Sequence, residues 1–286
     1  MTSLTLRNTA IVVDSTCDPP PGFFEQEGIF LVPLTVHFGD ETYRDHVDLT
    51  HDEFFAKLEA SAVLPTTSQP TIAEFQRCYA EATATYEHVL SLHLSRKLSG
   101  TMQAAEAAAT DLAAVEVIDT HTVCTAIALL VERLRTRLRD GIDHAEARAY
   151  IDRYCANSHT LIHADTLEYL RRGGRIGAAA SVVGGLLGIH PVIQVANGEV
   201  APYAKARGFH KARAAMLEYL DSHSTAQDQL YVGLVDAKAD PAVLVSLSEQ
   251  IVDLRPNAQI LMTGQVGAVV GTHIGPGTHA YCMIVE

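Results

Sequence analysis

The stretch AIVVDS, residues Ala10–Ser15, decides the expected fold of this chain. Its apolar residues follow one another without alternation, which predicts a strand that is buried on both faces. Asp14, Ser15 and the following Thr16 end the predicted strand, so polar groups reach the carboxyl edge of a sheet, where open parallel sheets bind ligands. The glycines of a dinucleotide-binding turn are missing at that point.

Similar patterns continue through the first half of the chain. Further strands are predicted at IFLVPLTV (Ile29–Val36), VLSLHLS (Val89–Ser95) and VEVIDT (Val115–Thr120). Amphipathic helices are predicted at Thr71–Thr85, Ser99–Ala113, Thr125–Arg139 and His144–Asn157. Strands that alternate with helices predict a parallel, Rossmann-like α/β domain. Residues 33–61 depart from this rhythm, and we expect an excursion there with a hairpin at Gly39-Asp40 and a short helix.

The second half of the chain predicts a different sheet. Strands are expected at LIHAD, PVIQVANGEVAPYAK, LYVGLVDA, AQILMTGQV, AVVGTHIG and AYCMIVE, with a hairpin turn at Asn197-Gly198. Helices are expected at Phe209–His223 and Ala242–Leu254. We therefore predict a mixed-sheet α/β domain with helices on one side. A length of 286 residues suits two domains, and we place them at 1–158 and 159–286.

Composition excludes several classes of function. A net charge of −13 argues against binding to nucleic acid or to an anionic membrane surface. The sequence shows no signal peptide and no membrane span, so we expect a cytoplasmic protein without stable membrane insertion. The five cysteines are far apart and odd in number, which suits reduced thiols.

Familiar catalytic and metal-binding motifs are missing. The chain has no GxxxxGK[ST], GxSxG, HExxH or paired CxxC pattern. His159 and His163 are four residues apart, which would suit a metal only on a helix, and the predicted element there is a strand. We therefore expect neither a cofactor nor a metal.

Three segments concentrate hydroxyl side chains near predicted strand ends: DST (14–16), TTSQP (66–70) and SRKLSGT (95–101). Ser99-Gly100-Thr101 opens a helix, whose free N–H groups and dipole favour an anion. Helix capping is the alternative explanation, with Thr71 and Glu74 spaced as in a capping box. Capping does not account for the hydroxyls at positions 66, 67 and 68 together.

A small anion site and an apolar wall together indicate a fatty acid. The wall is predicted at Ile176–Ile193, a stretch of small and apolar residues that could equally serve ordinary helix packing. Burying ~15 methylenes at ~0.8 kcal/mol each contributes ~12 kcal/mol before entropy costs. The carboxylate must be hydrogen-bonded, because its desolvation would otherwise cancel much of that gain.

Seven blocks in order resemble the DegV family of bacterial fatty-acid-binding proteins, which includes the binding subunits of fatty acid kinase: IVVDSTCD, VPLTVHFGDETYRD, LPTTSQP, LHLSRKLSGT, TLEYLRRGGRIG, KARGFHKA and GTHIGPG. The resemblance implies two α/β domains with the acyl chain between them. It implies a carboxylate site at Thr67, Ser68, Ser95, Ser99, Gly100 and His273. It also implies that Arg175, Arg207 and His273 handle the acyl carboxyl as it becomes an acyl phosphate in phospholipid synthesis.

The resemblance therefore implies a carrier that is not itself an enzyme and that presents a long-chain fatty acid to a separate ATP-binding kinase subunit. The family often has Ser-Ser where this chain has Ser95-Arg96; the arginine could be a solvated side chain or could alter the portal or the partner surface. One alternative is a hydrolase of acyl esters that uses Ser99 or Ser95 with His273. Another is a regulatory or structural module whose lipid is a folding cofactor.

Overall fold

A four-stranded parallel sheet organises the N-terminal half of the computed structural model, which describes residues 3–182 and 189–286. Its strands follow the order β2 (Ile29–Val32), β1 (Thr9–Asp14), β6 (His88–His93) and β7 (Val115–Asp119). Successive residues of β1 point to opposite faces, so both faces of the sheet are apolar, as the sequence predicted.

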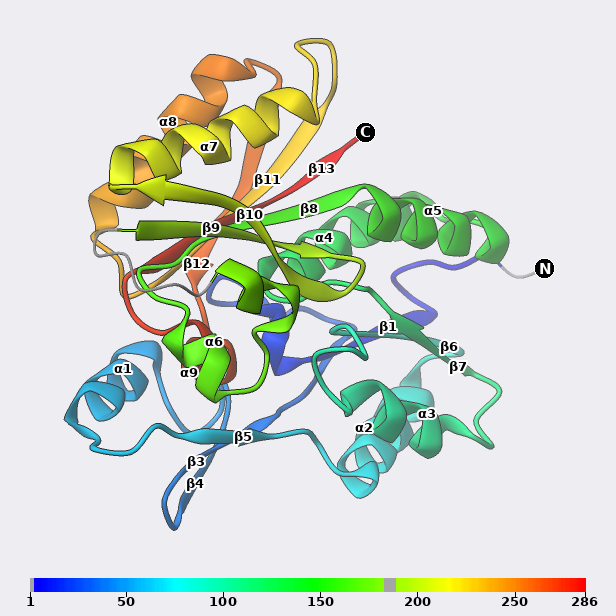
Figure 1. Ribbon diagram of the computed structural model, residues 1–286. Coiled ribbons are helices and arrows are strands. Elements are labelled where there is room, and N and C mark those ends of the chain that lie inside the picture. Colours follow the sequence, from blue (N-terminus) through cyan, green and yellow to red (C-terminus); the bar gives the residue numbers. More distant parts are fainter. Residues whose placement is uncertain (1–2, 183–188) are drawn as a thin grey trace.

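Helices cover both faces of this sheet (Figure 1). Ala10 and Val12 of β1 pack with α2 (Ile72–Thr85) and α3 (Thr101–Ala109). Their neighbours Ile11 and Val13 belong to the core that includes α4 (Thr125–Asp140) and α5 (His144–Asn157). The predicted Rossmann-like arrangement of the first half is thus confirmed.

The excursion and the strand that follows it in the chain form a small sheet. Its strands follow the order β4 (Glu41–Arg44), β3 (Thr35–Phe38) and β5 (Thr66–Ser68), and α1 (His51–Ala60) lies between β4 and β5 in the chain. The predicted hairpin at Gly39-Asp40 is confirmed by the pairing of β3 with β4. The expectation of one strand over Ile29–Val36 is wrong, because the chain passes from the parallel sheet to the small one at Pro33. Proline has no N–H to donate to a ladder and favours such a break.

The C-terminal half is built on a six-stranded mixed sheet. Its strands follow the order β10 (Glu199–Arg207), β9 (Ile189–Ala196), β8 (Ser158–His163), β13 (Thr278–Val285), β11 (Leu230–Ala237) and β12 (Ala258–Gln265). Strands β11 and β12 run parallel, and the other neighbouring pairs run antiparallel. The hairpin at Asn197-Gly198 joins β9 to β10, as predicted. The two-domain α/β fold is confirmed, while the boundary near Ser158 stays a prediction.

Helices contact both faces of this second sheet. On one face lie α7 (Phe209–Ser222) and α8 (Pro241–Leu254), seen above the sheet in Figure 1. On the other face α4 packs against β8, β11 and β13. The expectation of helices on one side only is therefore wrong, because α4 is shared between the two sheets and joins the two halves.

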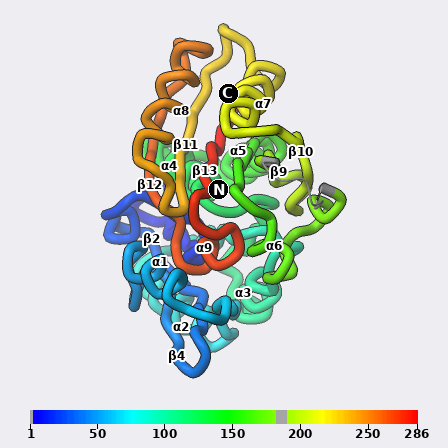
Figure 2. The backbone as a smooth tube through the Cα atoms, turned by 60° about the vertical axis from the view of Figure 1, so that its left-hand side comes forward, coloured from blue at the N-terminus to red at the C-terminus, as the bar shows by residue number. Residues whose placement is uncertain are grey.

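The segment AVVGTHIG was expected to form a strand, and this expectation is also wrong: Ala268–Ile274 forms the helix α9. The carboxylate of Asp18 accepts the N–H of Gly267 at 2.6 Å, and that of Asp45 accepts the N–H of Ala268 at 2.7 Å. These distant acids satisfy N–H groups of the first turn and complement the helix dipole. Helix α9 contacts α1 and α6 (Glu168–Arg172) (Figure 2).

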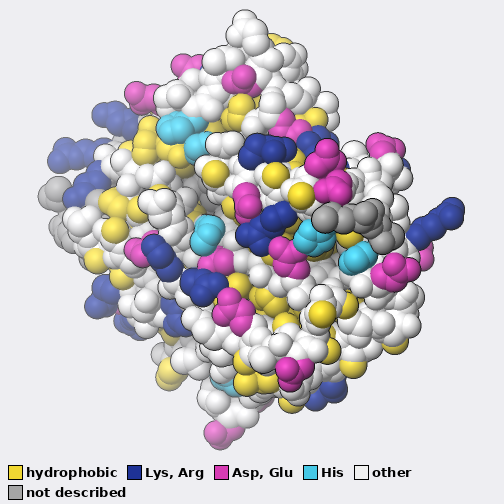
Figure 3. Space-filling model, turned by 90° about the vertical axis from the view of Figure 1, so that its right-hand side faces the viewer, with side chains coloured by type: hydrophobic (Ala, Val, Ile, Leu, Met, Phe, Trp, Pro, Cys, Tyr) yellow, Lys and Arg dark blue, Asp and Glu magenta, His cyan; other side chains and the backbone are white. Residues whose placement is uncertain are grey.

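The surface carries charges of both signs. On the face shown in Figure 3, acidic and basic side chains lie side by side rather than in a uniformly basic patch. None of the described helices combines the length and the apolar character needed to cross a bilayer. All five cysteines carry free thiols, as predicted.

Candidate functional site

A cavity of about 350 Å³ lies between the two sheets, a volume typical of small-molecule sites. Its wall is mainly aliphatic and comes from both halves of the chain: Leu34, Leu94, Leu98, Val123, Ile162, Leu170, Ile193, Val195, Val200, Val235, Val266, Val269, Val270, Ile274 and Ala280. Such a wall offers an elongated ligand an extensive apolar surface. Polar residues also line the cavity besides this aliphatic set: Thr16, Thr160, Asp236, Thr278 and His279.

Polar side chains gather at one part of this wall. Thr67, Ser68 and Gln69 enter it from β5 and the residue that follows. Ser99 precedes α3, Arg175 follows α6, and His273 lies in the last turn of α9. Five residues predicted from the sequence, Thr67, Ser68, Ser99, Arg175 and His273, therefore line one cavity.

A hydrogen bond joins the two halves at this point. The hydroxyl of Thr67 lies 3.0 Å from Nε2 of His273. Thr67 is held by the pairing of β5 with β3, where it stands opposite Val36. Because β5 holds Thr67 and α9 holds His273, the relative position of two separate elements sets this contact.

His273 is kept neutral at ordinary pH. Burial, and then the positive charge of Arg175, lower the pKa of its imidazole to about 4. Its Nδ1 is buried and has no hydrogen-bond partner among the described residues. Gly173 makes room for this ring, since a Cβ there would lie 2.3 Å from Nδ1. A neutral imidazole donates through one nitrogen and accepts through the other, so the tautomer decides whether Nε2 or Nδ1 of His273 is the donor.

Arg175 supplies the positive charge of the site. Its Nε donates to the carbonyl of Leu98 at 3.2 Å, and its Nη1 donates to the carbonyl of Gly173 at 2.7 Å. It donates to no carboxylate of the described residues, so its charge is not neutralised by an ion pair. An anion in the cavity would therefore meet an uncompensated guanidinium.

Ser99 and Gly100 form the entry to α3. The hydroxyl of Ser99 lies 2.9 Å from Oγ1 of Thr101 and accepts the Thr101 N–H at 3.3 Å. Gly100 is the N-cap residue and does not line the cavity. The amide of Gln69 packs against it, and a Cβ at position 100 would lie 2.0 Å from Gln69 Oε1.

Three predicted positions lie outside the cavity wall: Gly100, Ser95 and Arg207. The buried Ser95 hydroxyl accepts the N–H of Lys97 at 3.3 Å and lies against Gly198 of the β9–β10 turn. Arg207 is exposed at the end of β10. Arg96 bonds to Asp119 and Glu106 on the surface, each at 2.9 Å.

The sequence did not single out Gln69 or the strand residues of the wall. Gln69 could have been predicted from its position in TTSQP, directly after Ser68. The inward side chains of β8, β9 and β11 had no such signal, because continuous apolar runs do not show which residues face a cavity. Of the predicted wall Ile176–Ile193, Ile193 lines the cavity, while 183–188 lie outside the described residues.

The hydroxyl bonded to His273 belongs to a threonine. The hydrolase alternative paired this histidine with Ser99 or Ser95, whose hydroxyls have other partners. His159 and His163, which are four residues apart, bind different partners: His159 bonds to Tyr219, whereas His163 bonds to His190.

Comparison with known proteins places this architecture among its relatives. The family described as "Uncharacterised protein, DegV family" matches residues 8–286. A DegV domain-containing protein of Deinococcus radiodurans is 36% identical over 273 residues, covering 94% of this chain and 95% of the relative. A protein of Thermotoga maritima named fatty acid-binding protein is 32% identical and covers 94% of both chains.

Solved structures agree with the fold. A DegV family protein from Thermus thermophilus, described by its fatty acid binding, superposes with a TM-score of 0.90 at 33% identity and covers 98% of this chain and 100% of its own.

Proposed function

This chain belongs to the DegV family, and on that premise we propose that it binds one long-chain fatty acid in the cavity between its two sheets. The observation that carries the proposal is that one cavity combines a mainly aliphatic wall with a group of hydrogen-bonding side chains that includes Thr67, Ser99, Arg175 and His273. Two relatives whose names include fatty acid binding, from Thermus thermophilus and Thermotoga maritima, support it.

The proposed carboxylate site uses Thr67 as its central donor. If Nε2 of His273 carries the imidazole proton, it donates to the Thr67 oxygen and leaves the Thr67 O–H free to donate to the ligand. Ser68, Ser99 and the start of α3 supply further donors, and the charge of Arg175 favours the ionised acid. Hydrogen bonds to a charged group contribute about 1.5–3 kcal/mol each, which offsets the desolvation of the carboxylate.

Presentation to a kinase is the second part of the proposal. The chain carries the acid without acting as an enzyme, and a separate ATP-binding fatty acid kinase subunit phosphorylates the carboxyl to an acyl phosphate. His273 and Arg175 would then face the developing phosphate, and the exposed Arg207 would face the partner. The resemblance of RRGGRIG and GTHIGPG to family motifs, together with the placement of Arg175 and His273 in one wall, supports this division of roles.

Lipid extraction and ligand binding test the proposal. Protein purified under mild conditions should release one long-chain fatty acid per chain in mass spectrometry, and the delipidated protein should rebind such acids. Val195→Phe should fill part of the cavity and weaken binding of long acids more than of short ones, whereas Val252→Phe on the exposed face of α8 should not. Failure to copurify and failure to rebind any long-chain acid would overturn the proposal. Hydrolysis of acyl esters by the protein alone would favour the hydrolase instead.

A further inference from the structure

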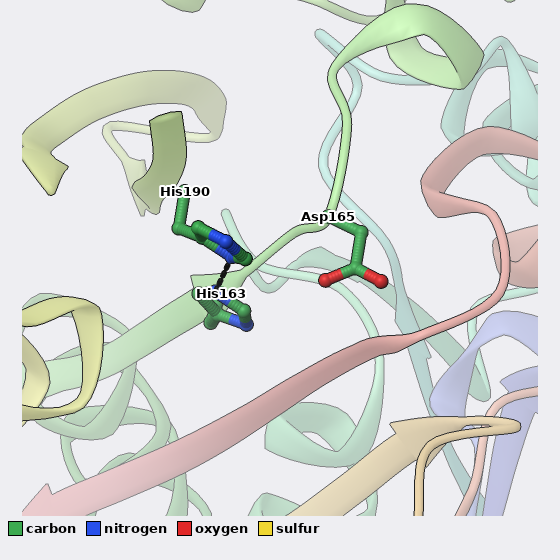
Figure 4. A group of neighbouring side chains, drawn as sticks. All are labelled: His163, Asp165 and His190. Atoms are coloured by element: carbon green, nitrogen blue, oxygen red, sulfur yellow. Dashed lines mark hydrogen bonds between the residues drawn. The ribbon is translucent and has the colours of Figure 1, made fainter. Parts of the chain in front are cut away.

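A second cluster of chemically active side chains lies outside the cavity. One donor atom each from His163, Asp165 and His190 lie within 4.8 Å of one another. Figure 4 shows the two imidazoles joined by a hydrogen bond, with nearly parallel rings, and a carboxylate oxygen of Asp165 directed toward them from the loop after β8. None of the three residues lines the fatty-acid cavity, although His279, whose ring centroid lies 4.7 Å from that of His163, does.

The sheet builds this cluster. Strands β8 and β9 are antiparallel neighbours in which His163 stands opposite Val192. Because side chains alternate along a strand, His190 points to the same face as Val192 and therefore as His163. His163 also packs against the ring of Phe209 in α7, with the centroids 5.5 Å apart, so this face is the one covered by α7.

The two histidines already have the spacing of metal ligands. Nε2 of His163 lies 3.1 Å from Nδ1 of His190. Zinc–nitrogen bonds of about 2.0–2.1 Å place two ligands of a tetrahedral ion about 3.3 Å apart. Asp165 is exposed and has no hydrogen bond within the described residues, so its carboxylate can turn toward an ion.

One buried nitrogen in the cluster lacks a partner. His163 is 1% exposed, and its Nδ1 has no hydrogen-bond partner among the described residues. A neutral imidazole carries one proton, and both facing nitrogens need lone pairs to bind a metal. If the proton between the rings belongs to Nε2 of His163, the proton can move to Nδ1 of His163. If the proton belongs to Nδ1 of His190, the proton can move to Nε2 of His190.

We propose that His163, His190 and Asp165 form a binding site for a divalent first-row transition metal such as Zn²⁺. Two imidazoles and one carboxylate are a donor set that suits these ions. Nη2 of Arg213 lies 3.4 Å from Nε2 of His279, whose ring packs against that of His163. The positive charge of Arg213 opposes a cation, so we expect weaker binding than at structural zinc sites.

Cobalt spectroscopy tests this site directly. Tag-free protein stripped with a chelator should bind one equivalent of Co²⁺ with visible d–d bands, and Zn²⁺ should displace them. His190→Ala and Asp165→Asn should each weaken binding at least tenfold. His223→Ala is the matched control, because His223 packs edge-on against His159 in another histidine pair that belongs to no three-ligand group in the described residues.

The outcomes separate a metal site from a mere hydrogen-bonded pair. Cu²⁺ bound to the protein should show two coupled nitrogens in electron paramagnetic resonance, and His190→Ala should remove one. The proposal is overturned by the absence of stoichiometric Co²⁺ bands, by wild-type affinity in both variants, or by intense sulfur charge-transfer bands that place the ion on a cysteine. If His190→Ala does not fold, as judged by circular dichroism, Asp165→Asn alone decides.

Discussion

The hydroxyl of Thr67 lies 3.0 Å from Nε2 of His273, although the two residues are 206 positions apart in the chain. One belongs to a three-residue strand of the small sheet and the other to the last turn of a seven-residue helix. Neither element is stable alone, since isolated short helices and strands are marginal in water. The polar end of the cavity therefore exists only when the two halves are assembled.

Removal of the Thr67 hydroxyl tests the carboxylate site. Thr67→Ala should weaken long-chain fatty-acid binding about tenfold to a hundredfold, because a hydrogen bond to a charged group contributes about 1.5–3 kcal/mol. Calorimetric or fluorescence titration of delipidated protein measures this change. Thr66→Ala is the control, because Thr66 is exposed on the same strand and does not line the cavity. Equal affinities of the two variants would refute the site.

Gly173 tests whether the position of His273 matters for binding. In Gly173→Ala the new Cβ would lie 2.3 Å from Nδ1 of His273 and would displace the ring. We expect fatty-acid affinity to fall, together with a loss of about 1–3 kcal/mol in the free energy of unfolding from overpacking. Titration and urea unfolding measure both quantities. Gly264→Ala is the control, since its Cβ would have only ordinary contacts beyond 3.7 Å. Wild-type affinity in Gly173→Ala would show that the ring position is unimportant.

The neutral state of His273 predicts a pH dependence of stability. The pKa of the folded group is about 4, whereas an unfolded histidine titrates near about 6.5. Between these values the unfolded chain binds the proton and the native state does not, so stability falls as the pH falls from about 6.5 toward 4. The contribution of this residue is at most about 3 kcal/mol, fully present above pH 6.5.

Urea unfolding at pH 7.5 and pH 5 measures this effect, and His273→Gln should reduce the difference between the two pH values. Comparison with the variant is needed because the pKa of His159, His163 and His279 is lowered as well. A His273 ring that titrates near 6.5 in NMR spectra of the native protein would contradict the prediction.

The Arg207→Ala variant distinguishes ligand binding from the proposed presentation to a kinase. It is exposed at the end of β10 and outside the cavity wall, so Arg207→Ala should leave fatty-acid affinity within about twofold of wild type. With an ATP-binding kinase subunit present, acyl-phosphate formation should fall at least fivefold, because the positive charge at the proposed partner surface is lost. Arg139→Ala, an exposed arginine at the end of α4, is the control. Undiminished acyl-phosphate formation in Arg207→Ala would remove this residue from the proposed role.

The local sequence pattern predicted the structure correctly where interactions between neighbouring residues decide it. The buried strand β1, the capping box of Thr71 and Glu74, and the Asn197-Gly198 hairpin all follow from neighbouring residues, and all are present. The segment Ala268–Ile274 shows the opposite case. Its β-branched pair Val269-Val270 favours a strand, but carboxylates from Asp18 and Asp45 satisfy the first N–H groups of a helix.

The candidate site divides in the same way. The sequence by itself determined the chemistry: hydroxyls at TTSQP and at SRKLSGT, a guanidinium in RRGGRIG and an imidazole in GTHIGPG. Only the tertiary structure decided that Thr67 and Ser68 line the cavity while Thr66 does not, and that Ser95 lies against the β9–β10 turn instead. The type of side chain is encoded locally, whereas its direction depends on strand register and on packing between elements that are distant in sequence.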